Sequence, residues 1–341
     1  MKYDKSAKEN TFELIGETPL VQLNKLVESI HPNVFAKLEL CNPSLSTKDR
    51  IVYRIIKDAE EKGLIKKNDH LVEATSGNTG ISLAMMAGIR GYKCILFVKD
   101  TITKEKYDLL KTFGAQIELC QADLLPDDPN SYYSRAKSYA KNTPDAFYIN
   151  QNFNPLNTQV HFETTGPEIW EQTQGKVTHL IASGSTGGTI SGIGKYLKQQ
   201  NPDIKVIGVD TKESILKHYH DKGSFDSKMR YKSGIVGVGK NIITGNFDFE
   251  LIDEFVYVDY EESAEYARQL MRLEGIWAGH SSGAAIQGLF EVQDKLTKDD
   301  TVVLVFSDHG SRYMTNIFKN TTLNGHHSNR QAIDSMVGKP Y

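Results

Sequence analysis

Short apolar runs alternate with longer segments of helical periodicity along most of the chain. In its first half, apolar runs of strand length occupy residues 71–74, 93–98, 116–119 and 146–149. Apolar residues with helical spacing occupy residues 51–59, 79–89, 104–113 and 132–141. Strands that alternate with helices are typical of parallel βαβ units, so we expect an open parallel sheet in this half.

The same alternation begins again after residue 150. Strands are predicted at residues 177–182, 205–209, 255–258 and 301–306, and helices at 190–199, 262–274 and 282–294. The polar segment 217–232 is expected to be a surface loop or a mobile flap, and the polar tail 321–341 to be flexible. Two successive α/β units predict two domains that face a cleft.

Composition and charge narrow the classes of partner. A chain of 341 residues can form two domains, and a net charge of −3 gives no electrostatic basis for binding nucleic acid or an anionic membrane. The chain has no apolar stretch of the roughly 20 residues that span a bilayer, and its first residues do not resemble a signal peptide. We therefore expect a cytoplasmic protein that binds small molecules. Cys and His residues do not occur with metal-ligand spacing, so we expect no metal site.

Lys48 stands at the start of the helix predicted around residues 51–59. The loop before it is rich in small polar residues, and we expect Ser46 or Thr47 to cap the helix. The positive end of the helix macrodipole disfavours the charge of a lysine in the first turn, and burial lowers its pKa further. Such a lysine is a nucleophile that can form an imine with a carbonyl compound. Because most lysines lie on the surface, Lys48 alone does not establish a function.

Three loops of small polar residues each follow a predicted strand. In open parallel sheets ligands bind at the carboxyl ends of the strands, so these loops are candidate binding sites. The first, residues 75–80, places hydroxyls, an amide and backbone N–H groups at a helix start, which suits a carboxylate or a phosphate. The second, residues 183–189, is glycine-rich and predicts a phosphate site. The third, residues 307–313, contains His309, which we expect to form a turn rather than to act in catalysis.

The glycine-rich loop also admits a dinucleotide-binding interpretation. Asp210 ends the next predicted strand, about 20 residues further on, where an acid would bind a ribose. The loop lacks the Gly-x-Gly-x-x-Gly spacing of such sites, and no lysine follows its glycines as in a Walker A loop. A lysine, a carboxylate loop and a phosphate loop together have a more economical interpretation, which is bound pyridoxal phosphate with an amino acid as substrate.

Longer motifs support the second interpretation. They are Thr-Pro-Leu at 18–20, His-Phe-Glu-Thr-Thr-Gly-Pro-Glu-Ile-Trp at 161–170, Glu-Gly at 274–275 and Ala-Gly-His-Ser-Ser-Gly-Ala-Ala at 278–285. With these motifs, and nearly from end to end, the chain resembles the cysteine synthase and cystathionine β-synthase family of pyridoxal-phosphate enzymes. The resemblance implies an α/β fold of type II, like that of the tryptophan synthase β subunit, with two open twisted sheets and flanking helices.

The resemblance also implies how the chain is divided and assembled. Residues 47–150 would form a smaller, mobile α/β domain that closes over the substrate and excludes water. Residues 1–46 together with 151–320 would form a larger domain that binds the cofactor. The protein is expected to be a homodimer.

Functional residues of the family carry over to matching positions of this chain. Lys48 is implied to form the imine with the cofactor and to carry the α-proton. The implied cofactor-binding residues are Asn78 at the ring hydroxyl, Ser307 at the pyridine nitrogen, and the phosphate-loop residues Ser185, Thr186, Gly187, Gly188 and Thr189. The implied residues for the substrate carboxylate are Thr75, Ser76, Gly77, Thr79 and Gln151. A neutral hydroxyl at the ring nitrogen does not keep it protonated, which implies β-elimination and replacement more than transamination.

The implied reaction is β-replacement on a serine derivative through an α-aminoacrylate. The leading hypothesis is an O-acetylserine (thiol) lyase, or cysteine synthase, that forms L-cysteine from O-acetylserine and sulfide. The nearest alternative is a cystathionine β-synthase-like or diaminopropionate-forming synthase that uses serine or O-phosphoserine. An NAD-dependent oxidoreductase and a non-catalytic ligand-binding relative are alternatives of other classes.

The chain departs from the family pattern at two positions. Leu45 stands where the family usually has glycine, and its bulk is expected to narrow or redirect the approach of the nucleophile. Ser185 stands where the phosphate loop usually opens with glycine, and we expect phosphate binding to survive because the backbone N–H remains. The segment 234–240 resembles the flap of the cystathionine synthase branch without matching it fully.

Overall fold

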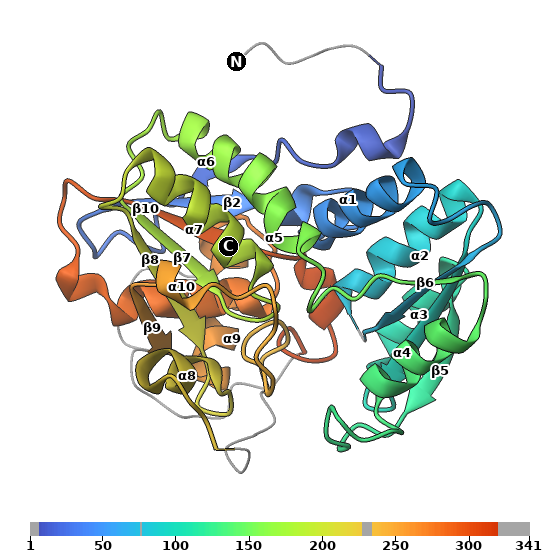
Figure 1. Ribbon diagram of the computed structural model, residues 1–341. Coiled ribbons are helices and arrows are strands. Elements are labelled where there is room, and N and C mark those ends of the chain that lie inside the picture. The colour runs from blue at the N-terminus through green and yellow to red at the C-terminus, as the bar shows by residue number, and fades with distance from the viewer. Residues whose placement is uncertain (1–6, 76, 227–233, 320–341) are drawn as a thin grey trace, which may run out of the picture.

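Two sheets with flanking helices organise the molecule (Figure 1). The computed structural model describes residues 7–75, 77–226 and 234–319. One sheet has six strands in the order β1-β2-β10-β7-β8-β9, and the other has four in the order β5-β4-β3-β6. This arrangement confirms the predicted α/β fold with two open sheets. The boundaries and the mobility of the two domains stay predictions, although all four strands of the smaller sheet come from residues 47–150.

The larger sheet is parallel except for β1, which runs antiparallel to β2. Its strands are β1 (Leu20–Gln22), β2 (Asn33–Leu38), β7 (His179–Ser183), β8 (Lys205–Asp210), β9 (Glu254–Tyr257) and β10 (Thr301–Phe306). All six residues of β10 are buried, as expected for a parallel strand covered on both faces. Successive residues of β7 pack on opposite faces. Leu180 joins the core beneath α7 (Gly188–Gln200), and Ile181 joins the core beneath α10 (His280–Glu291).

The smaller sheet is parallel throughout. Its strands are β3 (His70–Ala74), β4 (Lys93–Lys99), β5 (Gln116–Cys120) and β6 (Ala146–Tyr148). The helices of this half are α1 (Lys48–Glu61), α2 (Asn78–Arg90), α3 (Lys104–Thr112) and α4 (Tyr132–Asn142). Helix α2 is buried along most of its length because its residues are apolar or small on nearly every side, and it ends at Gly91 in the left-handed conformation.

The remaining elements connect or cover the larger sheet. They are α5 (Leu156–Val160), α6 (Gly166–Gln172), α8 (Leu216–Lys222), α9 (Tyr260–Gln269), the π-helical segments η3 (His161–Thr165) and η6 (Leu270–Glu274), and the short 3₁₀ segments η1 (Thr11–Leu14), η2 (Glu39–Cys41), η5 (Phe249–Leu251), η7 (Gln293–Lys295) and η8 (Gly310–Tyr313). Helix α8 runs into the segment 217–232, so the prediction of a loop there was wrong for residues 217–222. Residues 227–233 and the predicted flexible tail 321–341 lie outside the described residues.

Each sheet reverses its strand order at one point. In the larger sheet β8 and β9 follow β7 on one side, whereas β10 lies on the other side of β7. In the smaller sheet β4 and β5 follow β3 on one side, whereas β6 lies on the other. Ligands bind beyond the carboxyl ends of strands at such switch points. The predicted loops follow β3, β7 and β10, and Gln151 lies just beyond β6, so the candidate residues gather at the two switch points.

Arg50 fixes helix α1 to the larger half of the molecule. Its guanidinium is 2% exposed, lies 2.8 Å from Glu39 Oε1, and lies 2.6 Å from Glu168 Oε1 on α6. Lys37 Nζ, on β2, completes the network at 2.6 Å from Glu168 Oε2. Burial lowers the pKa of Arg50, but the two carboxylates outweigh it and raise that pKa above its ordinary value. The helix that begins at Lys48 is therefore held by ion pairs as well as by its apolar face.

Candidate active site

The amine of Lys48 lies in a setting that favours its neutral form. Lys48 is the first residue of α1 and is only partly exposed. Burial lowers its pKa to about 8, with the charge of Lys240 acting in the same direction and that of Asp308 opposing it. Thr47 occupies the N-cap position, but its side chain does not cap the helix, and Ser46 Oγ accepts instead from Lys48 N at 3.4 Å. The direction of this pKa agrees with the sequence-based expectation, and the role of Lys48 stays a prediction.

The loop before Lys48 pairs with the segment that follows β10. The N–H of Thr47 donates to Ser307 O at 2.9 Å, and the N–H of His309 donates to Leu45 O at 3.2 Å. Ser46 and Asp308 form an antiparallel bridge between these bonds. His309 itself accepts from the N–H of Ser311 and caps η8, which confirms the expectation that it forms a turn. The backbone therefore brings Lys48 to the carboxyl end of β10.

Residues of the predicted carboxylate loop lie at the switch point of the smaller sheet. The N–H of Gly77 donates to Thr75 Oγ1 at 3.3 Å, and Gly77 precedes the first residue of α2. Thr79 Oγ1 donates to Gln151 Oε1 at 2.6 Å, so two of the predicted substrate residues contact each other across the switch point. Ser76 lies outside the described residues. Backbone N–H groups at the start of α2 suit the carboxylate of an amino acid.

The predicted phosphate loop forms a tight turn at the start of α7. Gly187 has φ +86°, and a Cβ atom there would lie 2.5 Å from Phe247 Cδ2. A Cβ atom at Gly188 would lie 2.0 Å from Asn157 Oδ1. Asn157 Nδ2 donates to Thr186 Oγ1 at 3.2 Å and to Gln151 O at 2.7 Å, which ties this loop to the residue beyond β6. Only glycine fits these two positions, and the open backbone at a helix N-terminus suits a phosphate.

Asn78 and Asp308 join the two sheets. Asn78 Nδ2 donates to Asp308 Oδ2 at 2.8 Å, and Arg312 donates to the amide oxygen of Asn78. Asp308 is 1% exposed, whereas its neighbour Ser307 is only partly buried. Of Ser307 and Asp308, it is therefore Asp308 whose side chain contacts Asn78, a residue predicted to bind the cofactor. The assignment of Ser307 to the pyridine nitrogen stays a prediction.

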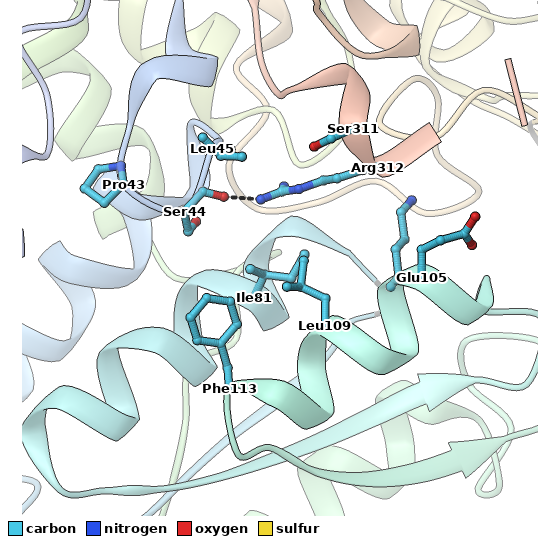
Figure 2. Close-up of a pocket in the computed structure, with 10 residues that line it drawn as sticks. Pro43, Ser44, Leu45, Ile81, Glu105, Leu109, Phe113, Ser311 and Arg312 are labelled. Atoms are coloured by element: carbon cyan, nitrogen blue, oxygen red, sulfur yellow. Dashed lines mark hydrogen bonds between the residues drawn. The ribbon is translucent and has the colours of Figure 1, made fainter. Parts of the chain in front are cut away.

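Leu45 lies beside a cavity of about 300 Å³ (Figure 2). Its backbone is left-handed, with φ +62°, and its side chain is 40% exposed. Figure 2 shows Leu45 on one side of the cavity and Ile81, Leu109 and Phe113 on the other. Arg312 lies between them and donates to the carbonyl oxygen of Ser44. The left-handed conformation gives a physical reason for a glycine at this position in other chains. An effect of Leu45 on the nucleophile stays a prediction.

Comparison with known proteins decides the family. The model of the family described as "Pyridoxal-phosphate dependent enzyme" matches residues 11–308. The chain belongs to the pyridoxal-phosphate-dependent enzymes. It is 39% identical over 303 residues to a cystathionine beta-synthase of Apis mellifera, covering 88% of this chain and 59% of that protein. It is 37% identical over 314 residues to cysteine synthase 1 of Emericella nidulans, covering 91% of this chain and 85% of that protein.

The fold of this pyridoxal-phosphate-dependent enzyme is also found in solved structures. The structure of O-ureido-L-serine synthase matches with a TM-score of 0.84 and 28% sequence identity, covering 97% of this chain and all of that one. The chain spans about three fifths of the length of the cystathionine beta-synthases of Apis mellifera and Dictyostelium discoideum. Among the described residues, we find no helix long and apolar enough to cross a membrane.

The residues at the switch points fit pyridoxal phosphate on two observations. First, Gly187 and Gly188 carry no side chain at the start of α7, where Phe247 and Asn157 pack against them and backbone N–H groups suit a phosphate. Second, two buried side-chain oxygens near Lys48, Thr47 Oγ1 and Asp308 Oδ1, lack a hydrogen-bond partner among the described residues. Buried polar atoms without partners indicate a polar ligand that the chain itself does not supply.

The dinucleotide interpretation does not account for Asp210. Asp210 is fully buried, and Oδ2 accepts from the N–H of Lys217 at 2.9 Å at the start of α8. Burial raises the pKa of its carboxyl group to about 6 despite this bond. Asp210 therefore orders the connection into α8, a helix that the sequence did not predict. The family assignment replaces the NAD-dependent alternative.

Sequence reasoning missed three ionisable residues, Asp308, Lys240 and Glu73, of which the first two act on the charge of Lys48. Asp308 directly follows Ser307, and this adjacency was its only signal. Glu73, the penultimate residue of β3, is fully buried. Burial raises its pKa to about 7, although the N–H groups of Gln151 and Ala74 donate to its carboxylate. The charge of Lys240 lowers the pKa of both Lys48 and Glu73. Lys240 ends the segment 234–240, whose resemblance to a flap gave no separate signal for the lysine.

Proposed function

We propose that the protein catalyses pyridoxal-phosphate-dependent β-replacement on an activated serine. O-Acetylserine is the proposed first substrate and sulfide the second, which gives L-cysteine. The observation that carries the proposal is the position of Lys48. Its amine has a lowered pKa, and the loop before it pairs with the segment after β10, whose Asp308 is bonded to Asn78 at the start of α2. The identity to cysteine synthases of Emericella nidulans and Dictyostelium discoideum supports this choice.

Each group of residues has a proposed task in this reaction. Pyridoxal phosphate supplies an aldehyde that captures amines and a ring that withdraws electrons from the bonds of the α-carbon. Lys48 would hold the cofactor and, once displaced by substrate, would take and return the α-proton. Ser185 to Thr189 would bind the phosphate, and Asn78 would bind the ring hydroxyl. Thr75, Ser76, Gly77, Thr79 and Gln151 would hold the substrate carboxylate and orient the bond that breaks.

Lys240 supports a second candidate function. Its Nζ lies 3.1 Å from Asn152 Oδ1 and 3.4 Å from the hydroxyl of Tyr133, both neutral partners. A second cation whose charge reaches Lys48 suits a substrate that carries an additional negative charge. The candidate is a cystathionine β-synthase-like or diaminopropionate-forming synthase that uses O-phosphoserine, or that uses serine with a carboxylate-bearing nucleophile. The cystathionine beta-synthase relatives and the match to O-ureido-L-serine synthase agree with a nucleophile other than sulfide.

Substitution of Lys48 tests the proposed attachment of the cofactor. The purified protein is expected to absorb visible light, and Lys48→Ala is expected to lose the covalent attachment. Lys57→Ala removes a half-exposed lysine of the same helix and is expected to change neither property. A wild-type protein that stays colourless after incubation with the cofactor would contradict the proposed function.

Separate additions of amino acids choose between the two functions. We expect O-acetylserine to change the visible spectrum of the cofactor-loaded protein and sulfide to reverse the change. O-Phosphoserine could change the visible spectrum instead. If Lys240→Met weakens that change more than it weakens any change caused by serine, the second candidate replaces the first. A protein whose spectrum responds to none of the three would be the non-catalytic relative considered above.

Assembly and location complete the proposal. We propose that the protein is a homodimer in the cytoplasm, as the resemblance and the sequence imply. Light scattering coupled to size-exclusion chromatography measures the mass of the assembly against the 38.2 kDa of the chain. A mass of one chain at micromolar concentration would contradict the proposed dimer.

A further inference from the structure

The carboxylate of Glu73 holds the chain beyond β6 at the point where the backbone pairing of β3 with β6 ends. Val72 is the last residue of β3 that pairs with β6, and its carbonyl oxygen accepts from the N–H of Ile149 at 3.0 Å. Asn150 then has φ +56°, and this left-handed residue turns the chain out of strand geometry. The next N–H, that of Gln151, donates to Glu73 Oε2 at 3.0 Å. A side chain therefore fixes the residue that the strand no longer fixes.

Both oxygens of this carboxylate accept from backbone N–H groups. Oε1 accepts from the N–H of Ala74 at 2.7 Å, and Ala74 lies beyond the residues of β3 that pair with β6. Glu73 is fully buried, and a buried carboxylate is tolerated where hydrogen bonds compensate for the lost water. Glu73 thus links the end of β3 to the residue beyond β6, at the switch point of the smaller sheet.

Gln151 connects this carboxylate to both loops of the proposed site. Its carbonyl oxygen accepts from Asn157 Nδ2 and from Asn246 Nδ2, each at 2.7 Å, and Asn157 Nδ2 also donates to Thr186 Oγ1 in the phosphate loop at 3.2 Å. Its side-chain oxygen accepts from Thr79 Oγ1 at 2.6 Å. Its side-chain nitrogen, Nε2, has no hydrogen-bond partner among the described residues and keeps accessible surface. The amide N–H groups of Gln151 are therefore available to a carboxylate oxygen.

Glu73 is the group of this cluster whose charge changes near neutral pH. Burial raises its pKa to about 7, while the two N–H bonds and the charge of Lys240 lower it. Its ionisable neighbours on the adjoining elements are Tyr148 on β6 and Tyr132 on α4. Burial raises the pKa of both phenols, and the charge of Glu73 adds to this effect, so both keep their protons at pH 7.

We propose that Glu73 is a positioning residue, which holds the N–H of Gln151 and thereby directs the Gln151 side chain at the carboxylate of the amino-acid substrate. This inference rests on the proposed function. Glu73 acts through Gln151 and does not touch the substrate. Its negative charge alone would repel a substrate carboxylate, so its charge and its hydrogen bonds act on the site in opposite directions. Removal of the carboxylate weakens substrate binding if position dominates, and strengthens it if repulsion dominates.

Titration of the cofactor-loaded protein with L-alanine tests the inference. L-Alanine has the amine and carboxylate of the substrate but no β-substituent that can leave, so the change in visible absorbance measures binding without reaction. Glu73→Gln keeps the shape but sets an amide N–H against one of the two backbone donors, and Glu73→Ala removes both acceptors. We expect the Kd for L-alanine to rise by about 10-fold in Glu73→Gln and by more in Glu73→Ala.

Asp69→Asn is the matched control. Asp69 directly precedes β3 at the opposite end of the same strand, is 8% exposed, and accepts from the N–H of Lys66 at 2.9 Å. The variant is expected to leave the Kd for L-alanine unchanged, and both variants are expected to keep the cofactor. An equal loss of affinity in Asp69→Asn, or tighter binding in Glu73→Gln, would overturn the inference.

The wild type keeps the inference testable even if the Glu73 variants do not fold. The amine of L-alanine titrates above neutral pH and adds a constant slope to the Kd between pH 6 and pH 8. Glu73 is expected to add an inflection near pH 7, with weaker binding on the acid side, where its carboxyl group is protonated. A cofactor-loaded wild type without this inflection would overturn the role of Glu73 and leave the proposed function intact. A wild type that binds no cofactor would overturn the proposed function itself.

Discussion

A lysine whose amine titrates near pH 8 reacts differently from a surface lysine at physiological pH. Burial gives Lys48 this property, and the opposing charges of Asp308 and Lys240 adjust it. We expect the cofactor to attach to cofactor-free protein at a rate that rises with pH through about 8, the pKa of this amine. Stopped-flow absorbance measures the rate, and a rise only near 10.5, the ordinary lysine pKa, would contradict the assignment.

The same lowered pKa affects stability. Between pH 8 and pH 10.5 the unfolded chain binds the proton of Lys48 and the folded chain does not. Stability therefore increases with pH across this window, and the contribution of Lys48 is unfavourable below it. Cofactor-free Lys48→Met, which lacks the titrating amine, is expected to lose this part of the pH dependence in denaturant unfolding.

Leu45 is predicted to be strained, because a side chain with φ +62° crowds its own backbone. Leu45→Gly removes the strain together with the side chain, whereas Leu45→Ala removes most of the side chain and keeps the strain. We expect the glycine variant to be more stable than the alanine variant by about 1 kcal/mol in denaturant unfolding. Equal stabilities would show that the left-handed conformation carries no penalty here.

Individual residues divide into those that the sequence could place and those that it could not. Lys48 was predictable because helix position and burial act on it locally. The contact of Asp308 with Asn78 was not predictable. Beyond the end of β10 the backbone no longer follows strand geometry, so the sequence does not show which way each side chain points. Lys240 contacts Tyr133 on α4, which is 107 residues away in the sequence, and neither segment contains a local pattern that predicts this contact.

At the scale of elements, the turn before α7 is the most constrained part of the site. Gly187→Ala is expected to destabilise the protein by more than the ~1–2 kcal/mol that a left-handed residue costs, because the methyl group also collides with Phe247. Gly63→Ala is the matched control. It has φ +66° with open space around it, so only the backbone term applies.

Cofactor affinity distinguishes a local effect of Gly187 from a general one. We expect Gly187→Ala to weaken the binding of pyridoxal phosphate, and Gly63→Ala to leave it unchanged. Titration followed by visible absorbance measures both. If the two variants lose affinity equally, the loop before α7 does not bind the phosphate.

The elements that the sequence predicted share one property, which is a recognisable spacing of apolar residues. Strand β10 is an example, since its six residues are all buried. Strand β2 was missed because Lys37 interrupts its apolar run. That lysine is fully buried and is paired with Glu168 across the fold. Helix α8 was missed because its residues are mostly polar and only Leu216 is buried.

At the scale of the whole molecule, the network around Arg50 is expected to determine acid stability. Arg50→Met would leave Glu39 as a buried charge with fewer partners, at a cost of about 3–5 kcal/mol. Arg54→Met on the same helix is the control, because its 3.8 Å pair with Glu163 is partly exposed and is worth less than about 1 kcal/mol. Guanidinium unfolding of both variants measures the difference.

The direction with pH follows from the lowered pKa values of the carboxylates. Although burial raises them, Arg50 and Lys37 lower the pKa of both Glu39 and Glu168 below the ordinary value. Their stabilisation is therefore present near neutral pH and is lost as pH falls below about 4.5, where the unfolded chain takes up protons first. In that pH range, the free energy of unfolding of the wild type is expected to approach that of Arg50→Met.

The chain order of the strands has a consequence for synthesis. Strand β10 is the last strand to be made, yet it lies between β2 and β7 in the middle of the larger sheet. At about 5–20 residues per second, a ribosome needs roughly 15 to 60 s to reach Phe306. During that time β2 and Lys48 are already outside the ribosome without their neighbour. With the proposed site, which includes the segment after β10, the cofactor would be captured only near the end of translation, and chains released early would expose an unpaired sheet to cellular proteases.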